Sequence, residues 1–300
     1  MEIISKILIT GATGYIGRNL LKRFINSNNV EISIITRNKS NLKFIDSFKD
    51  KITIYLYDSS YESIENIFKN NKFDYVFHLA SFSKFKYHSL ELSEIIDSNI
   101  KFGTYILEAM SKYGSKFFIN TSSYWQNYRS FKSEPICLYA ATKQGFEDII
   151  NYYSLDKNIK AISLKLYDVY GYEDNRNKFI NTLITHNLEL IDVTKGEQLL
   201  SLVFIDDVVD AYFHSMKLIL NTKHNHSIYG VYSNEKISIK EIIKKIKKIL
   251  HKEFKVNFGV VEYNNLQIMD PYFEKKLPGW SAKVTFSKGL KIIKNLNEKK

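Results

Sequence analysis

The segment Thr10-Gly-Ala-Thr-Gly-Tyr-Ile-Gly17 decides the fold of this chain. It directly follows a short apolar run at Lys6–Thr10 and opens an amphipathic stretch at Tyr15–Ser27, which predicts a strand, a glycine-rich turn and a helix. Glycine permits a positive φ and lets backbone N–H groups approach a phosphate. A glycine-rich turn without a ligand is the alternative, but the place at the first strand–helix junction favours a bound dinucleotide.

The first half of the chain alternates apolar runs with amphipathic stretches, which is typical of βαβ units and a parallel sheet. The predicted strands are Lys6–Thr10, Ile32–Thr36, Ile52–Tyr57, Tyr75–Ala80, Phe117–Thr121 and Ala161–Leu166. The predicted helices are Tyr15–Ser27, Tyr61–Asn70, Leu92–Tyr113 and Leu138–Ser154. Near-continuous apolar strands indicate a sheet covered on both faces. We therefore expect an α/β fold with a Rossmann-type, doubly wound parallel sheet.

After Tyr167 the pattern becomes irregular, without an internal repeat or a long linker. The predicted helices are Phe179–Asn187, Asp206–Leu220 and Ile237–His251, and the predicted extended segments are Leu200–Phe204, Ser227–Tyr232 and Phe254–Val261. We expect residues 1–166 and 201–226 to form the dinucleotide-binding core. Residues 167–200 and 227–300 are expected to form a smaller, C-terminal substrate-capping region.

The basic charge of the chain is concentrated at one end. The 300 residues carry a net charge of +11, and only five of the 43 basic residues are Arg. From Lys236 onward there are 16 Lys and 6 acidic residues. Nucleic-acid binders favour Arg for bidentate contacts, so we expect no nucleic-acid partner. The lysines of Ile237–His251 are read as a solvated helix face, with attraction of an anionic substrate as the alternative.

Cysteine content and hydropathy indicate the cellular compartment of the protein. The single Cys137 excludes a disulfide framework and a cysteine-based zinc site, and no metal is expected. His78 and His224-Asn-His226 are read as a packed residue and a polar turn. No apolar stretch approaches 18 residues and no signal peptide is recognisable, so we expect a cytoplasmic protein without membrane insertion.

The end of the second predicted strand bears on the choice of dinucleotide. An acidic residue there binds the ribose of NAD, whereas Arg accommodates the 2′-phosphate of NADP. The chain reads Ile34-Ile35-Thr36-Arg37-Asn38-Lys39. NADPH is therefore favoured, and NAD with Arg37 as an ordinary solvated charge is the alternative.

A tyrosine and a lysine share one face of the predicted helix Leu138–Ser154. Tyr139-Ala-Ala-Thr-Lys143 spaces them by four positions. A phenol is a poor base at neutral pH, and a fixed positive charge nearby lowers its pKa. Ser122 and Ser123 end the fifth strand, at the edge where open α/β sheets bind ligands.

Together these motifs resemble the extended short-chain dehydrogenases/reductases of the NAD-dependent epimerase/dehydratase type. The resemblance covers nearly the whole chain and is carried by Thr10–Gly17, Asp58, Asp74–Ala80, Asn99 with Gly103-Thr104, the Tyr139/Lys143 pair, Leu164–Gly171, Phe204–Ala211 and Leu277–Trp280. It implies a catalytic set of Ser123, Tyr139 and Lys143. It also implies a homodimer that pairs the helices Leu92–Tyr113 and Leu138–Ser154.

The resemblance further implies two sets of contacts. The cofactor would be bound by Gly11, Thr13, Gly14, Tyr15, Ile16, Gly17, Arg37, Asp58, Leu79, Ala80, Ser81, Asn99, Lys143 and Tyr167. The substrate, a nucleotide-linked sugar, would be bound by Ser83, Ser122, Trp125, Asp168, Arg176 and Lys178. The family often has Asn where Asp168 stands, and an Arg common before the Asp206-Asp207 pair is missing, so Arg176 or Lys178 would bind the diphosphate instead. Trp125 and Tyr124 either stack on the substrate or pack in the core.

The residues after the fifth strand bear on the reaction. The 4,6-dehydratases of the family carry Thr-Asp-Glu where this chain has Ser123-Tyr124-Trp125, which disfavours dehydration. Asn120–Gln126 and Leu138–Asp148 resemble CDP-abequose and CDP-paratose synthases. We therefore expect an NADPH-dependent reductase of the 4-keto group of a CDP-linked deoxy sugar, acting in surface polysaccharide biosynthesis. The alternatives are an NAD-retaining 4-epimerase and, more remotely, a non-enzymatic NADP-binding regulator.

Overall fold

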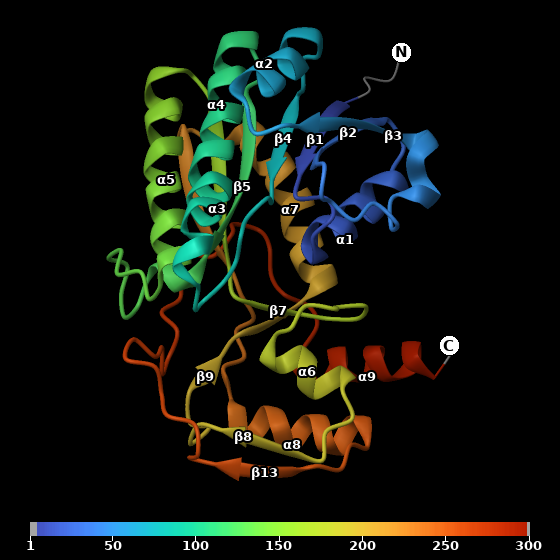
Figure 1. Ribbon diagram of the computed structural model, residues 1–300, viewed down its shortest axis with the longest axis vertical. Coiled ribbons are helices and arrows are strands. Elements are labelled where there is room, and N and C mark those ends of the chain that lie inside the picture. The colour runs from blue at the N-terminus through green and yellow to red at the C-terminus, as the bar shows by residue number, and fades with distance from the viewer. Residues whose placement is uncertain (1–4, 299–300) are drawn as a thin grey trace.

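One seven-stranded parallel sheet organises the molecule (Figure 1). The computed structural model describes residues 5–298. The strand order is β11-β6-β5-β4-β1-β2-β3, with every neighbouring pair parallel. Successive strands are added in opposite directions on the two sides of the β1–β4 pair, so this pair is the switch point at which doubly wound sheets bind ligands. The expected α/β Rossmann-type fold is confirmed.

The elements of this domain follow the apolar runs of the sequence, with ends within two residues of those predicted. The strands are β1 (Ser5–Thr10), β2 (Val30–Arg37), β3 (Ile52–Tyr57), β4 (Tyr75–His78), β5 (Phe117–Ser123), β6 (Lys160–Leu166) and β11 (His226–Val231). The helices are α1 (Tyr15–Ile25), α2 (Tyr61–Asn70), α3 (Leu92–Ile96), α4 (Phe102–Tyr113), α5 (Leu138–Asp156) and α7 (Ile205–Asn221). None of these helices, nor any other between residues 5 and 298, is long and apolar enough to cross a membrane.

Side chains alternate across the sheet and feed two separate cores. Ile7 and Ile9 of β1 point to the face covered by α1 and α7, whereas Leu8 points to the face covered by α2, α4 and α5. All three side chains are fully buried. Both faces are therefore covered, which explains why the central strands are apolar at consecutive positions.

The predicted helix Leu92–Tyr113 is interrupted by a short π-helical stretch. α3 and α4 are joined by a π-helical stretch at Asp97–Lys101, and Asn99 lies in its centre. π-helical turns are rare and are often found at functional sites. A hydrophobic pattern of period 3.6 does not reveal such a turn, because the chain remains helical through it.

A smaller lobe lies below the carboxyl ends of the strands, drawn from yellow to red in Figure 1. It contains β7 (Asp168–Tyr170), α6 (Phe179–Thr185), β8 (Leu190–Val193), β9 (Leu199–Leu200), β10 (Leu202–Phe204), β12 (Ile237–Ser238), α8 (Ile239–Leu250), β13 (Lys255–Phe258) and α9 (Phe286–Asn297). The domain boundary expected between 226 and 227 falls inside β11. Because β11 pairs with β6 over its whole length, residues 227–231 belong to the sheet.

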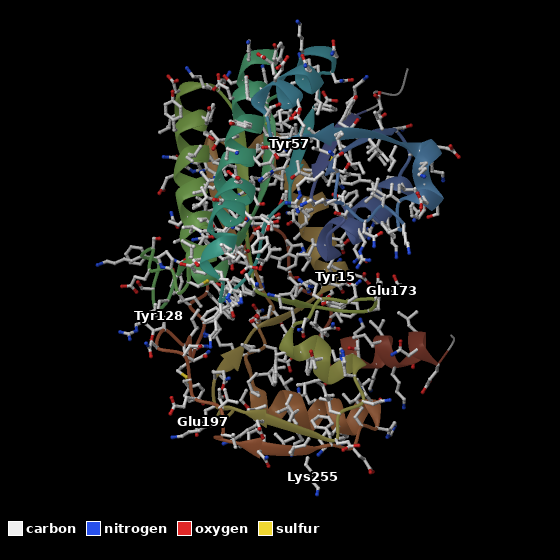
Figure 2. All side chains as sticks on the ribbon, viewed as in Figure 1. Tyr15, Tyr57, Tyr128, Glu173, Glu197 and Lys255 are labelled. Carbon is white, nitrogen blue, oxygen red and sulfur yellow. The ribbon has the colours of Figure 1, made fainter. Side chains whose placement is uncertain are left out.

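The lysine-rich helix α8 has one buried and one basic face. Four of its five isoleucines, Ile239, Ile242, Ile243 and Ile246, are buried. The basic face lines a shallow groove of about 1180 Å³ between α8 and β13, whose lining residues include six lysines, His251 and Glu253. Figure 2 places Lys255 of β13 at the far end of the lobe, remote from Tyr15 at the boundary with the sheet domain.

Alanine substitutions at two glycines test how closely α1 packs on the sheet. A Cβ on Gly17 would lie 2.1 Å from the backbone oxygen of Gly11, whereas a Cβ on Gly145 of α5 would meet only Ile100 at 3.9 Å. We expect Gly17→Ala to lower the free energy of unfolding by about 1–3 kcal/mol because the overlap is with backbone. Gly145→Ala is the control and should raise it by about 0.5–1 kcal/mol. Equal stability of the two variants in urea would contradict this packing.

Candidate active site

The glycine-rich turn forms a cradle without side chains at the switch point. Gly11 has φ of +70°, and a Cβ there would lie 2.5 Å from the backbone nitrogen of Ala80. Together with the contact of Gly17, this brings the N-terminus of α1 close to the end of β4. Exposed N–H groups at a helix N-terminus favour an anionic ligand. The cradle therefore fits the pyrophosphate of a dinucleotide.

A pocket of about 570 Å³ opens beside this cradle. Its wall includes seven of the residues expected at the cofactor, namely Gly11, Thr13, Gly14, Arg37, Leu79, Ala80 and Ser81. The wall also includes residues that the sequence did not single out, among them Thr36, Ser40, Tyr57, Ser59, Ser93, Glu94, Asp97 and Ser98. Several of these carry hydroxyl groups, which suit the polar edges of a ribose or an adenine base.

Two expected cofactor residues at the pocket edge already have protein partners. The Arg37 guanidinium donates to Glu94 at 3.4 Å, and both side chains are largely exposed. The Asp58 carboxylate accepts hydrogen bonds from the backbone N–H and the hydroxyl of Ser60, at 2.8 and 2.6 Å. Tyr57 and Ser59 line the pocket on either side of Asp58, whose own carboxylate is turned toward the start of α2.

Tyr15 and Ile16 take part in packing at the start of α1. The Tyr15 hydroxyl donates to the carbonyl of Tyr172 at 3.1 Å, which joins α1 to the loop after β7. Ile16 is half-buried against the core on the α1 side of the sheet. Their side chains therefore support the turn, and a cofactor contact by either residue would come from its backbone.

Asn99 ties the loop after β4 to the helix α5. Its amide oxygen accepts from the Phe82 backbone at 2.8 Å and the Ser81 hydroxyl at 3.0 Å. Its amide nitrogen donates to the Thr142 hydroxyl at 2.9 Å. Asn99 is 1% exposed, so its role in this structure is to hold the loop Leu79–Ser83 beside the helix that carries Tyr139 and Lys143.

Three serine hydroxyls lie near the buried phenol of Tyr139. Burial raises the pKa of Tyr139 to about 12, and the hydroxyls of Ser83, Ser81 and Ser123 act against that rise through hydrogen bonding. Ser81 and Ser83 come from the loop after β4 and Ser123 from the end of β5, so the fold brings together four residues that the sequence placed at the site. A lowering of the Tyr139 pKa by Lys143 remains a prediction.

The Lys143 ammonium is buried without a hydrogen-bond partner in the described structure. The side chain is 1% exposed, and its nitrogen contacts no acceptor among residues 5–298. Burial lowers the pKa of Lys143 to about 8, and the carboxylate of Glu147 opposes this shift. An unsatisfied buried ammonium is costly. The site therefore fits a ligand that supplies acceptor oxygens to Lys143, as a ribose would.

The neighbours Ser122 and Ser123 point in opposite directions at the end of β5. The Ser123 hydroxyl faces the Tyr139 side and accepts from the Trp125 backbone at 3.3 Å. The Ser122 hydroxyl donates to Glu147 at 2.5 Å in the interior and is 1% exposed. The expected substrate contact of Ser122 is not supported, because alternation along a strand turns it away from Ser123.

The expected substrate residues Trp125, Asp168 and Lys178 lie together on the lobe side of Tyr139. The Trp125 ring meets Tyr139 edge-on, with centroids 6.0 Å apart, and the Lys178 ammonium lies 5.5 Å from the Trp125 centroid. The Asp168 carboxylate accepts from the Tyr124 hydroxyl at 2.8 Å. Burial raises the pKa of Asp168 to about 6, with Tyr124, Lys178 and Arg176 opposing the shift.

Arg176 and Tyr167 are held by protein contacts. The Arg176 guanidinium forms two bonds with the Asp174 carboxylate, at 2.8 and 2.7 Å, and lies 4.4 Å over the Tyr15 ring. Of the two cations expected to bind the diphosphate, Lys178 therefore has the weaker contacts with other protein groups. The Tyr167 ring stacks on Tyr124, and its hydroxyl donates to the Tyr272 carbonyl at 2.5 Å.

The parallel sheet, the glycine cradle and the buried Tyr139/Lys143 pair are together the features of a dinucleotide-binding enzyme of the short-chain dehydrogenase/reductase type. Residues 7–231 match the model of the family described as "NAD dependent epimerase/dehydratase family". That match spans most of the chain, which therefore belongs to this family.

Similar proteins have been described in bacteria. The CDP-abequose synthase of Salmonella muenchen is 29% identical over 99% of this chain and 100% of its own length. That of Salmonella typhimurium is 25% identical over 97% and 98%. Among solved structures, the UDP-glucose 4-epimerase of Thermotoga maritima with UDP-glucose has a TM-score of 0.83 and 22% identity, over 98% of this chain and 99% of that one. This likeness shows the shared fold.

Sequence reasoning did not single out the polar residues behind Ser123. Glu147, Gln126 and Lys165 are at most 4% exposed and contact one another under the end of β5. Glu147 follows Lys143 by four positions, so helical spacing alone places it on the same face as the Tyr139/Lys143 pair. The contact with Lys165 of β6 depends on the sheet and has no sequence signal.

A substitution tests the burial of the Asp168 carboxyl. Its pKa rises from 3.8 when unfolded to about 6 when folded. The folded state therefore binds more protons between these values, and stability decreases as pH increases through this window. We expect Asp168→Asn to gain stability over the wild type progressively from pH 4 to pH 7, measured as Tm. An advantage that does not change with pH would contradict a raised pKa.

Proposed function

We propose that this protein is an NADPH-dependent reductase of the 4-keto group of a nucleotide-linked deoxy sugar, with CDP as the nucleotide. The observation that carries the proposal is the arrangement of Tyr139 beside the Ser123 hydroxyl, with the unpartnered Lys143 ammonium on the same helix. The resemblance to CDP-abequose synthases along their full length supports the nucleotide and the sugar class.

The dinucleotide would lie along the glycine cradle and the pocket beside it. The pyrophosphate would lie against the turn that contains Gly11, Gly14 and Gly17. The nicotinamide side would be bound by Ser81 and Lys143. Arg37, at the end of β2 and on the pocket wall, would accept a 2′-phosphate after releasing its exposed contact with Glu94. When bound, the reduced cofactor supplies the hydride for C4 of the sugar.

The side chains would handle the oxygen of the reacting carbonyl. Ser123 would donate a hydrogen bond to that oxygen and hold it beside Tyr139. Tyr139 would donate its proton as the oxygen becomes an alkoxide. Lys143 would keep its positive charge near the phenol, which lowers the energy of the phenolate that remains.

The residues around this centre favour simple reduction over the other reactions of the family. A 4,6-dehydration needs an acid and a base beyond the catalytic serine, whereas Tyr124 and Trp125 stand there. A 4-epimerase retains NAD, and the second strand ends in Arg37 without an acidic residue. Epimerisation remains the alternative, and the consumption of NADPH distinguishes the two reactions.

The sugar and its diphosphate would occupy the space between Tyr139 and the lobe. Ser83 and Trp125 would contact the sugar, with Asp168 near its hydroxyl groups. Lys178, which lies over the Trp125 ring, is the cation best placed for the diphosphate. At neutral pH an ionised Asp168 would repel that diphosphate, and its raised pKa reduces this repulsion.

The same family resemblance supports a proposal for the oligomeric state and the cellular role of the enzyme. We propose a cytoplasmic homodimer that pairs the helices at the α3, α4 and α5 edge and acts in surface polysaccharide biosynthesis. Exposed apolar side chains on these helices support that interface, namely Leu92, Ile96, Tyr152 and Leu155.

The reaction is tested by NADPH absorbance with CDP-4-keto-3,6-dideoxyglucose. We expect one NADPH oxidised per sugar reduced, and a loss of kcat of roughly 100- to 10,000-fold in Tyr139→Phe, because the proton donor is removed. Tyr55→Phe, on the outer strand β3, is the control and should keep wild-type kcat. Interconversion of a nucleotide-linked 4-hydroxy sugar with its C4 epimer, without net loss of NADPH, would favour the epimerase.

Cofactor preference is tested at Arg37. We expect Arg37→Ala to weaken NADPH binding about 10-fold or more, because a charge-assisted contact to the 2′-phosphate is lost. Binding of NADH should change little, as measured by titration calorimetry for both cofactors. Equal weakening of the two would exclude Arg37 as the residue that selects NADPH.

A further inference from the structure

Glu147 is a buried carboxylate behind the catalytic set. It lies on α5, four positions after Lys143, and is 2% exposed. One carboxylate oxygen accepts from the Ser122 hydroxyl at 2.5 Å, and the other accepts from the Gln126 amide at 2.8 Å. Both oxygens are thus used to bind the segment that carries Ser123.

Gln126 passes this restraint to Ser123. Its amide nitrogen donates to Glu147, and its amide oxygen accepts from the Ser123 backbone N–H at 2.9 Å. A carboxylate only accepts hydrogen bonds, so it forces the NH2 of Gln126 toward itself and leaves the oxygen for Ser123. The carboxylate of Glu147 therefore sets the orientation of the amide that anchors Ser123, together with the Gln144 amide oxygen, which accepts from the same Gln126 nitrogen at 3.1 Å.

Lys165 of β6 is the counter-ion that makes this buried carboxylate tolerable. Its ammonium lies 3.9 Å from Glu147, 3.2 Å from Glu274 and 2.7 Å from the amide oxygen of Asn127. Lys165 is 4% exposed. Buried charges are retained only where a partner and hydrogen bonds offset their desolvation, and this site supplies both. The Asn127 contact extends the same network into the loop after β5.

We propose that Glu147 is a positioning residue for Ser123, acting through the Gln126 amide, with Lys165 as its counter-ion. The proposal rests on the proposed function, since it takes Ser123, Tyr139 and Lys143 as the reacting set. Glu147 also acts on Lys143 through space. Its negative charge raises the pKa of Lys143 against the effect of burial. One carboxylate thus supports both the position of the serine and the charge of the lysine.

Glu147→Gln is the first variant to compare with the wild type. An amide at 147 offers one acceptor oxygen in place of two, so either the Ser122 hydroxyl or the Gln126 amide loses its acceptor, and the Ser123 anchor is weakened without a change of size. We expect kcat to fall roughly 10- to 100-fold through misplacement of Ser123, with the KM for NADPH within about 3-fold of the wild type. The alkaline limb of the kcat–pH profile should move to lower pH, because Lys143 loses a neighbouring negative charge.

Glu108→Gln is the matched control for a general effect on helix α5. Glu108 accepts from the Tyr153 hydroxyl at 2.7 Å, so this variant also removes a carboxylate bonded to α5. It should leave kcat and the pH profile unchanged. If both variants lower kcat only in proportion to a lower Tm, Glu147 is merely structural and the proposal is wrong.

The exchange variant Gln126→Glu/Glu147→Gln tests the geometry directly. It restores an acceptor for the Ser123 N–H and a donor–acceptor pair between positions 126 and 147. We expect it to recover a large part of the kcat lost in Glu147→Gln. Absence of any recovery, or wild-type kcat and pH profile in Glu147→Gln itself, would overturn the proposal.

A structural readout separates this proposal from the proposed reaction. Crystal structures of the wild type and Glu147→Gln should show the Ser123 N–H bonded to residue 126 only in the wild type. If the wild type does not oxidise NADPH with the CDP-keto sugar, the proposed function fails, and the crystal structures still decide the role of Glu147. An unchanged Ser123 anchor in Glu147→Gln would count against that role.

Discussion

The close backbone contact between the first turn and the end of β4 is the constraint on which the rest of the site depends. Gly11 approaches Ala80 so closely that no Cβ fits, and Gly17 lies against the carbonyl of Gly11. This contact places the start of α1 at the switch point of the sheet. It also fixes the position at which the loop Leu79–Ser83 begins. Asn99 then links this loop to α5 by hydrogen bonds to Ser81 and Thr142. The serines of that loop reach Tyr139 because both attachments exist.

Desolvation is the electrostatic feature that distinguishes the site from the rest of the molecule. Lys143 is buried without an acceptor, Asp168 is half-buried with a raised pKa, and Glu147 is buried against Lys165. Groups with pKa values moved toward neutrality are typical of sites that bind or transfer protons. The excess of lysines, by contrast, gathers on the exposed face of α8 at the far end of the lobe, where charge is screened by water.

Much of the fold could be predicted because the sheet is covered on both faces. Each central strand contains a run of consecutive apolar residues, and α2 was predicted from its pattern with the correct ends. Other elements escaped prediction. β7 and β8 are short and pair with segments distant in sequence, and α9 lies in a lysine-rich tail although Phe286, Leu290 and Ile293 share one face. At the site, Tyr139 and Lys143 followed from helical spacing and Ser123 from the family resemblance, whereas Ser122 was expected at the substrate and is turned into the interior.

The sequence by itself determined the class of fold, the glycine cradle and the tyrosine–lysine pair, because each depends on local spacing within one turn or one helix. The tertiary structure alone decided that Ser122 faces Glu147 in the interior, that Arg176 is engaged by Asp174, and that Glu147 meets Lys165. These outcomes depend on which side chains of separate strands and loops meet in the interior. Packing of distant segments sets such contacts, and local periodicity carries no information about them.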